Sequence, residues 1–245
     1  PLMGGDDDKF DDLSYQLDQI MWWRLGSPPA PIGYDPAGLA KLTAGARAFR
    51  ESTDRAIVGL FGGNLLEIGE FAFRIDNFLY ELAAEPKRMH AFLDRVVEIH
   101  LANLEKFLGA VGPYIDVIGF GDDLGMQTGP QISPRMYKEF FKPRHSLLWN
   151  RAKELQPGIK VMLHCCGGVY SLFPHLIEAG LDIINPVQTT CADMEPDRLK
   201  REFGKDMVFW GGGCNTRDVL PKGTPEQVAK DVRERVSILA PGGGF

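Results

Sequence analysis

The 245-residue sequence lacks the features that mark proteins of membranes or nucleic acids. No apolar run approaches the ~18 residues that a membrane-spanning helix needs. Basic residues are not in excess, because 27 lysines and arginines stand against 33 acids and give a net charge of −6. Binding to nucleic acid normally requires a basic patch or stripe. The composition therefore predicts a protein that binds neither membranes nor nucleic acid.

Cysteine is scarce, and its spacing excludes two common uses. The four cysteines stand at positions 165, 166, 191 and 214, and none forms the C-x-x-C motif of redox and ribbon-type metal sites. Adjacent cysteines rarely bridge each other, and the spacing is unlike that of a small secreted disulfide framework. No secretory signal pattern is visible. We therefore expect reduced thiols and a cytoplasmic location.

Short apolar runs alternate with amphipathic segments from residue 56 onward. Five runs are expected to be buried strands, at residues 56–63, 116–123, 160–166, 182–188 and 207–213. Helix starts follow in the form of a capping residue and a proline, at Ser133–Pro134 and Thr224–Pro225. Strands that alternate with helices indicate βαβ units and a parallel sheet.

Two α/β architectures fit this alternation, an incomplete barrel and an open doubly wound sheet. A G-x-G-x-x-G motif, which would favour dinucleotide binding, does not follow the first strand. A (β/α)8 TIM barrel has eight strands, so the five strands predict a barrel that is incomplete in this chain, with N-terminal and C-terminal parts missing. We expect one barrel domain over residues 1–245, in which residues 1–55 form an irregular covering segment.

The segment "KVMLHCC" combines one histidine and two cysteines at the end of a predicted strand. Side chains alternate along a strand, so His164 and Cys166 face one side and Cys165 faces the other. Barrel enzymes place their chemistry at this end of the strands, and Cys214 follows the strand at 207–213. One imidazole and two thiolates suit zinc, and three protein ligands leave a position open. The pattern predicts a zinc site at His164, Cys166 and Cys214, although free cysteine is often a small buried apolar residue.

A zinc ion with two thiolate ligands favours one kind of chemistry over another. An open position can bind a substrate thiol and lower its pKa, so that it becomes a nucleophilic thiolate. Hydrolysis by zinc-bound water is the alternative, but hydrolytic zinc sits more often among histidines and carboxylates. The two predicted thiolates therefore favour alkyl transfer.

Three stretches resemble the uroporphyrinogen decarboxylase superfamily: "GFGDDLGMQTGPQISPRMYKEFFKPRHSLL", "VMLHCCGGVYSLFPHLIEAGLDIINPVQ" and "FWGGGCNTRDVLPKGTPEQVAKDV". The resemblance covers residues 56–245 and is strongest to the corrinoid-linked methyltransferases. It implies a TIM barrel with zinc on His164, Cys166 and Cys214. It also implies methyl transfer between a corrinoid protein, or a methylated substrate, and a small-molecule acceptor that is a thiol such as coenzyme M or tetrahydrofolate. The implied cofactors are Zn²⁺ and either a corrinoid carried by the partner protein or tetrahydrofolate.

Two alternatives remain open beside the methyltransferase. One is a metal-free uroporphyrinogen decarboxylase, although the arginine-rich motif of the type "RQAGRY" that holds substrate carboxylates in such enzymes is absent here. The other is a non-catalytic protein that binds a corrinoid or another tetrapyrrole. The sequence leaves the oligomeric state and the identity of the methyl donor and acceptor open.

Five further residues are candidates for the site. Asp122 and Asp123 end the strand at 116–123, where either could position substrate or take a proton, with loop capping as the competing role. Gln127 could hydrogen-bond a pterin or an amide. Arg217 could pair with an anionic substrate group. Glu67 is expected near the mouth as a substrate contact or a displaceable fourth ligand, with a solvated first helical turn as the competing interpretation.

Overall fold

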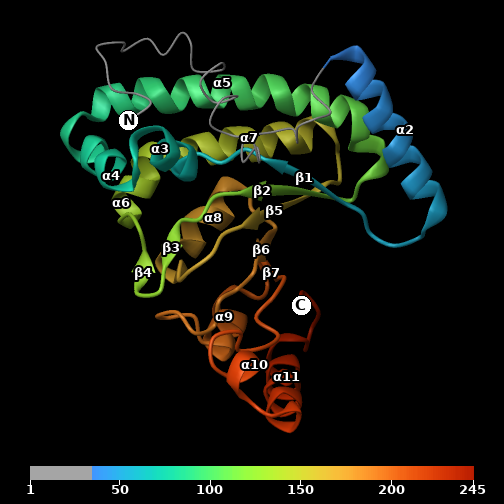
Figure 1. Ribbon diagram of the computed structural model, residues 1–245, viewed down its shortest axis with the longest axis vertical. Helices are drawn as coiled ribbons and strands as arrows, with labels where there is room; N and C mark the ends of the chain where they lie inside the picture. Colours follow the sequence, from blue (N-terminus) through green and yellow to red (C-terminus); the bar gives the residue numbers. More distant parts are fainter. Residues whose placement is uncertain (1–34) are drawn as a thin grey trace.

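A single parallel sheet organises the computed structural model, which describes residues 35–245 (Figure 1). Its five strands lie in the order β1-β2-β5-β6-β7, and every neighbouring pair is parallel. The strands are β1 (Val58–Gly62), β2 (Val117–Gly121), β5 (Lys160–His164), β6 (Ile183–Asn185) and β7 (Val208–Phe209). Each strand lies within one of the five apolar runs, so the predicted α/β fold with a parallel sheet is confirmed.

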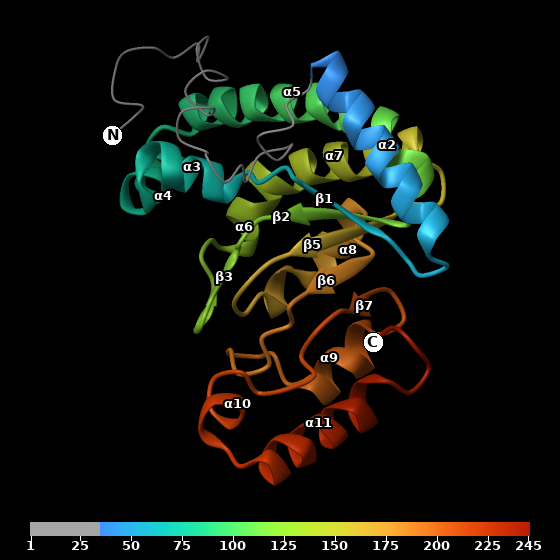
Figure 2. The ribbon, with the colours of Figure 1, turned by 45° about the vertical axis from the view of Figure 1, so that its right-hand side comes forward.

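Helices connect the strands and cover one side of the sheet. Helices α5 and α7 lie over the same side of β1, β2 and β5, while α9, α10 and α11 gather beyond β7 (Figures 1 and 2). The helices are α2 (Pro36–Ser52), α3 (Leu66–Phe73), α4 (Ile75–Ala84), α5 (Pro86–Val111), α6 (Pro134–Met136), α7 (Lys142–Leu155), α8 (Phe173–Ala179), α9 (Pro196–Phe203), α10 (Val219–Lys222) and α11 (Pro225–Leu239). A π-helical turn at Tyr137–Phe141 joins α6 to α7. None of the described helices is long and apolar enough to cross a membrane.

The two faces of the sheet differ in how they are covered. Side chains that face the helices, such as Ile118 and Leu163, are fully buried in the main core. The opposite face holds only a small buried cluster of Val117, Met162 and Ile183. At its edge, Leu60 is 69% exposed. Strands β1 and β7 are the two edges of this sheet, so the strands of residues 35–245 form an open sheet and not a closed barrel.

The described part of residues 1–55 is more regular than expected. Residues 36–52 form helix α2, whose Asp35 caps the N-terminus by accepting hydrogen bonds from the backbone N–H groups of Ala37 and Gly38. The helix was not predicted because it buries few apolar side chains and shows no clear period. Arg50 pairs with Asp116 and so ties α2 to the start of β2. Residues 1–34, including Trp22 and Trp23, lie outside the described residues.

Candidate metal centre

Three side chains that could hold a metal ion meet at the carboxyl ends of β2 and β5. Asp123 stands two residues beyond β2, His164 ends β5, and Cys166 stands two residues beyond it. One ligand atom from each, a carboxylate oxygen, an imidazole nitrogen and a thiol sulfur, lies within 4.8 Å of the other two. These are the donor types that zinc binds in proteins. The residues present therefore fit a zinc ion, and we call Asp123, His164 and Cys166 the donor group.

Strand alternation places the two predicted donors of "HCC" as expected. Cys165 is 1% exposed and belongs to the main core, whereas His164 is exposed and Cys166 is half-buried. The Sγ atom of Cys166 lies 3.6 Å from Nε2 of His164. The Sγ atom of Cys165 instead accepts a hydrogen bond from the backbone N–H of Leu124. His164 and Cys166 therefore share one face, and Cys165 is a core residue.

Asp123 is the donor that the sequence did not indicate as a ligand. Its Oδ1 atom accepts a hydrogen bond of 2.7 Å from the backbone N–H of Cys166. Its own backbone N–H donates to Oε2 of Glu67 at 3.2 Å, and its carbonyl accepts from Nε2 of Gln131 at 2.7 Å. These contacts hold the backbone of Asp123 in place and direct its carboxylate toward Cys166. The sequence held one sign of this role: Asp123 ends a predicted strand, and the next predicted strand along the chain ends in His-x-Cys.

Asp122 has a different role from its neighbour. It is 0% exposed, and its two carboxylate oxygens accept hydrogen bonds from the backbone N–H groups of Leu66 (3.0 Å) and Glu67 (3.1 Å). Nε2 of His145 lies 3.3 Å from Oδ2. Asp122 thus satisfies N–H groups at the N-terminus of α3, where negative charge is favourable. Asp122 therefore caps α3, which differs from the expected capping role in the loop before Ser133, and its catalytic role stays a prediction.

Cys214 does not lie in the donor group. Burial raises the pKa of the Cys214 thiol, and a hydrogen bond with the Asp231 carboxylate raises it further. Asp231 also accepts from the backbone N–H of Asn215 at 2.7 Å and pairs with Nε of Arg235 at 3.1 Å. The structure thus brings together two of the three predicted zinc ligands, and it holds the third against α11.

The two remaining substrate-binding candidates make their hydrogen bonds with residues outside the donor group. Nε2 of Gln127 donates to the carbonyl of Thr190, and the carbonyl of Gln127 accepts from the backbone N–H of Ala192 at 3.0 Å. Gln127 therefore ties its loop to residues 190–192. Arg217 is exposed, and its backbone N–H donates to Oδ1 of Asn215. Substrate binding by Gln127 and Arg217 stays a prediction.

A short antiparallel hairpin, which the sequence did not predict, packs against the loop at residues 166–168. It consists of β3 (Gly125–Met126) and β4 (Gly129–Pro130), and the backbone N–H of Gly168 donates to the Met126 carbonyl at 2.8 Å. Gly167 has a φ of +87°, and a Cβ atom there would lie 2.2 Å from the carbonyl carbon of Gly125. Only glycine allows this approach. The glycine pair at 167 and 168 therefore lets the backbone of this loop contact the backbone of the hairpin directly, beside the donor group.

Additional carboxyl groups surround Asp123. Burial, followed by the nearby charges of Asp122 and Asp123, raises the pKa of Glu67 to about 7. Burial, Asp122 and Glu67 likewise raise the pKa of Glu70 to about 7. The end of the sheet next to α3 is therefore acidic, and part of its charge is neutralised by bound protons near neutral pH.

Replacing Glu70 with glutamine is expected to make stability less dependent on pH. Between the ordinary glutamate pKa and about 7, the folded state binds more protons than the unfolded state, so stability falls as pH rises through this window. Glu70→Gln removes that loss. The free energy of unfolding of the variant, relative to that of the wild type, should rise by about 1 kcal/mol from pH 5 to pH 8. This is less than the full pKa shift of Glu70 implies, because Glu70 is partly solvated.

Urea unfolding at the two pH values measures this difference. The matched control is Glu139→Gln, at an exposed glutamate of the π-helical turn, which should show the same difference from the wild type at both pH values. A Glu70→Gln variant whose difference from the wild type is the same at pH 5 and pH 8 would contradict the assignment.

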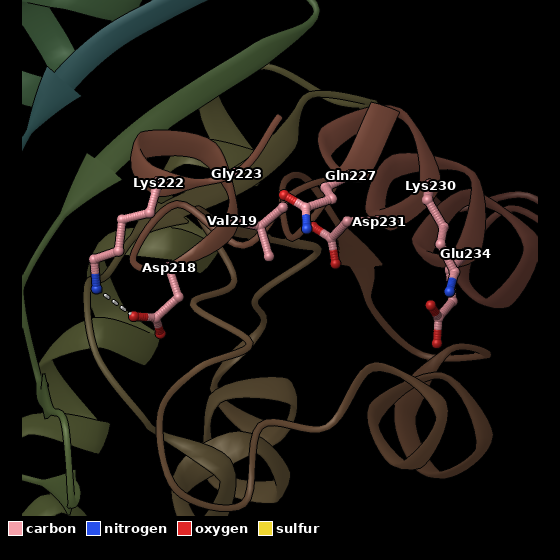
Figure 3. A pocket seen from close by; sticks show the side chains of 8 residues that line it. All are labelled: Asp218, Val219, Lys222, Gly223, Gln227, Lys230, Asp231 and Glu234. Atoms are coloured by element: carbon pink, nitrogen blue, oxygen red, sulfur yellow. Dashed lines mark hydrogen bonds and ion pairs between the residues drawn. The ribbon is translucent and has the colours of Figure 1, made fainter. Parts of the chain in front are cut away.

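A separate surface pocket lies between α10 and α11 (Figure 3). Its volume is about 400 Å³, and both acidic and basic side chains line it, including an ion pair of 2.7 Å between Lys222 and Asp218. Asp231, the partner of Cys214, also lines it. The pocket is away from the donor group and contributes no member to it.

A family model, a curated protein and a solved structure match this chain. The family model described as uroporphyrinogen decarboxylase (URO-D) matches residues 68–245. A methylated-thiol–coenzyme M methyltransferase of Methanosarcina mazei is 30% identical over 161 residues, which are 65% of this chain and 39% of that protein. The solved structure of a methyltransferase from Methanosarcina mazei superposes with a TM-score of 0.59 at 18% identity, covering 79% of this chain and 55% of the other. The chain thus spans about two fifths of the curated relative and about half of the solved one.

Proposed function

Because the chain belongs to the uroporphyrinogen decarboxylase family, we propose that it is part of a zinc-dependent methyltransferase of that family. The observation that carries the proposal is the donor group, where an imidazole, a thiol and a carboxylate meet at the carboxyl ends of adjacent strands. The methyltransferase named among its relatives supports the same reaction class. We further propose that the open sheet is part of a (β/α)8 barrel, whose active sites lie at this end of the strands.

The proposed ligands are His164, Cys166 and Cys214, with Asp123 as a displaceable oxygen ligand. Zinc held there would act as a Lewis acid that lowers the pKa of an acceptor thiol. The loop that carries Cys214 leaves the carboxyl end of β7, which is on the same edge of the sheet as the carboxyl ends of β2 and β5. It would have to exchange its hydrogen bond with Asp231 for the metal.

Glu67, beside the donor group, would accept the proton that the acceptor loses. Glu67 is hydrogen-bonded to the backbone N–H of Asp123, which places its carboxylate next to the donor group. We propose that a Glu67 oxygen takes the proton that the acceptor thiol loses. The hairpin at Gly125–Pro130 packs against the backbone of Cys166 and Gly167.

The proposed methyl donor is a corrinoid protein or a methylated substrate, and the proposed acceptor is a small thiol or tetrahydrofolate. The curated relative is named for a methylated thiol and coenzyme M, which favours a thiol as the acceptor. Tetrahydrofolate remains the second acceptor to test. A cytoplasmic location remains a prediction.

The electrostatics of the site do not favour porphyrinogen decarboxylation. A porphyrinogen carries several carboxylates, which would be repelled by Asp123 and by the ionised fraction of Glu67 and Glu70 in a partly buried site. A metal-free decarboxylase also has no need for the His-x-Cys pair. Binding of a tetrapyrrole without catalysis gives no reason for zinc donors either.

A direct comparison of the two reactions tests the proposal. The purified protein is supplied with zinc and free methylcobalamin, and methylation of 2-mercaptoethanesulfonate and of tetrahydrofolate is measured. We expect methylation of one acceptor that stops when zinc is chelated and resumes when zinc is restored. Loss of carboxylates from a porphyrinogen by the chelated protein, without methyl transfer by the zinc-loaded protein, would overturn the proposal. Binding of cobalamin or porphyrin without turnover of either substrate would do the same.

A further inference from the structure

A chain of hydrogen bonds crosses the ends of three neighbouring strands and reaches His164. Nδ1 of His164 lies 2.7 Å from Oδ1 of Asn185, and Nδ2 of Asn185 donates to the backbone carbonyl of Trp210 at 2.8 Å. The three residues end or follow β5, β6 and β7, in that order across the sheet. Asn185 is not itself a member of the donor group, and its sequence position gave no sign of this role.

The chemistry of these groups fixes the direction of each bond. A backbone carbonyl only accepts hydrogen bonds, so the NH₂ group of Asn185 must face Trp210. The amide oxygen of Asn185 therefore faces His164, and because that oxygen only accepts, Nδ1 of His164 must carry the proton. In the neutral imidazole the lone pair is then on Nε2, the atom 3.6 Å from Sγ of Cys166.

Backbone pairing within the sheet holds the residues at both ends of this hydrogen-bonded series, His164 and Trp210, in place. His164 and Asn185 are direct partners in the register of β5 and β6. The backbone N–H of Trp210 donates to the carbonyl of Ile184 at 2.9 Å, which continues the pairing of β6 with β7 and fixes the Trp210 peptide. Asn185 therefore stands between two paired strands, and the Trp210 carbonyl orients its amide group.

We propose that Asn185 is a positioning residue that holds His164 in the tautomer protonated on Nδ1 and so presents the lone pair of Nε2 to the metal. Metal-binding histidines commonly donate their other ring N–H to an acceptor, which fixes both tautomer and ring orientation. The metal part of this inference rests on the proposed function. The tautomer part does not, because it concerns the protein without metal.

Nitrogen NMR of histidine in the metal-free protein tests the tautomer. The protein, which contains five histidines, is labelled with ¹⁵N-histidine, and His164→Gln assigns the resonance. At about pH 8, above the pKa of a free imidazole, we expect Nδ1 of His164 to be the protonated nitrogen. Asn185→Ala should shift the population toward the proton on Nε2, which a free imidazole prefers. Asn185→Asp keeps an acceptor oxygen and should keep the Nδ1–H tautomer.

Zinc affinity provides the second readout. Loss of a partner of this kind typically costs 10- to 100-fold in metal affinity, so Asn185→Ala should bind zinc about 10- to 100-fold more weakly. Asn185→Asp should stay within a few-fold of the wild type. The matched control is Asn150→Ala, which removes an asparagine bonded within α7 to Ser146 and should change neither readout.

The outcomes separate this inference from the proposed function. A wild-type protein with the proton on Nε2, or an Asn185→Ala variant with an unchanged tautomer, overturns the positioning role whether or not zinc binds. A protein with the expected tautomer that binds no zinc overturns the proposed function and leaves the tautomer assignment intact. If Asn185→Ala does not fold by circular dichroism, Asn185→Leu, which fills a similar volume without an acceptor, takes its place with the same expected results.

Discussion

Replacing Cys166 with serine is expected to weaken zinc binding by more than about 100-fold and to abolish methyl transfer. The thiol of Cys166 is the sulfur of the donor group. Loss of partners that only orient a ligand costs 10- to 100-fold, so loss of a ligand should cost more. Competition with a chromophoric zinc chelator measures the affinity, and transfer from methylcobalamin measures the activity.

The neighbouring cysteine is the matched control for this prediction. Cys165 is 1% exposed in the core, where its Sγ atom accepts a hydrogen bond from the backbone N–H of Leu124, so it does not face the donor group. Cys165→Ala should therefore bind zinc as the wild type does, at a cost of about 1 kcal/mol in stability for the small cavity left in the core. Equal loss of zinc in the Cys165 and Cys166 variants would show that neither thiol is a specific ligand.

Replacing Asp122 with alanine is expected to destabilise the fold by about 3–5 kcal/mol. The substitution removes the partner of the buried Nε2 atom of His145 and leaves the backbone N–H groups of Leu66 and Glu67 without their acceptor. Removing one member of a buried pair costs about this much because the remaining polar groups stay desolvated. Urea unfolding followed by circular dichroism measures the change.

Asp123→Ala separates structural from functional effects at adjacent positions. The Asp123 carboxylate is half-buried and accepts one backbone hydrogen bond, from Cys166. Its removal should cost about 1 kcal/mol in stability, while it changes zinc affinity and the rate of methyl transfer. Similar stability losses for Asp122→Ala and Asp123→Ala would contradict the capping role of Asp122.

The sheet was predictable because its strands are apolar on both faces at their centres. Continuous apolar runs ended by glycine or polar residues are typical of parallel strands, and all five runs form strands. The hairpin at Gly125–Pro130 was not predictable, since its two-residue strands carry no period and are held by Gly168 from a distant loop. Helix α2 was missed because its apolar face is weak.

The candidate site was predictable where it depended on strand alternation. This rule correctly separated His164 and Cys166 from Cys165. It did not show which of Asp122 and Asp123 faces the site, because both follow the last paired residue of β2 and tertiary contacts orient them. The expected convergence of Cys214 depended on the course of a loop. That loop packs Gly211 against the carbonyl of Pro186, where a Cβ atom would lie 1.9 Å away, and no local pattern encodes this contact.

X-ray absorption at the zinc edge, on protein purified with zinc, tests the central claim most directly because it counts sulfur and lighter ligands around the metal. The proposed set of His164, Cys166, Cys214 and Asp123 predicts about one equivalent of zinc with two sulfurs at about 2.3 Å and nitrogen or oxygen ligands at about 2.0–2.1 Å. Cys214→Ser should lower the sulfur count to one. A single sulfur in the wild type would contradict Cys214 as a ligand. Zinc without sulfur ligands, or no bound zinc, would contradict the account as a whole.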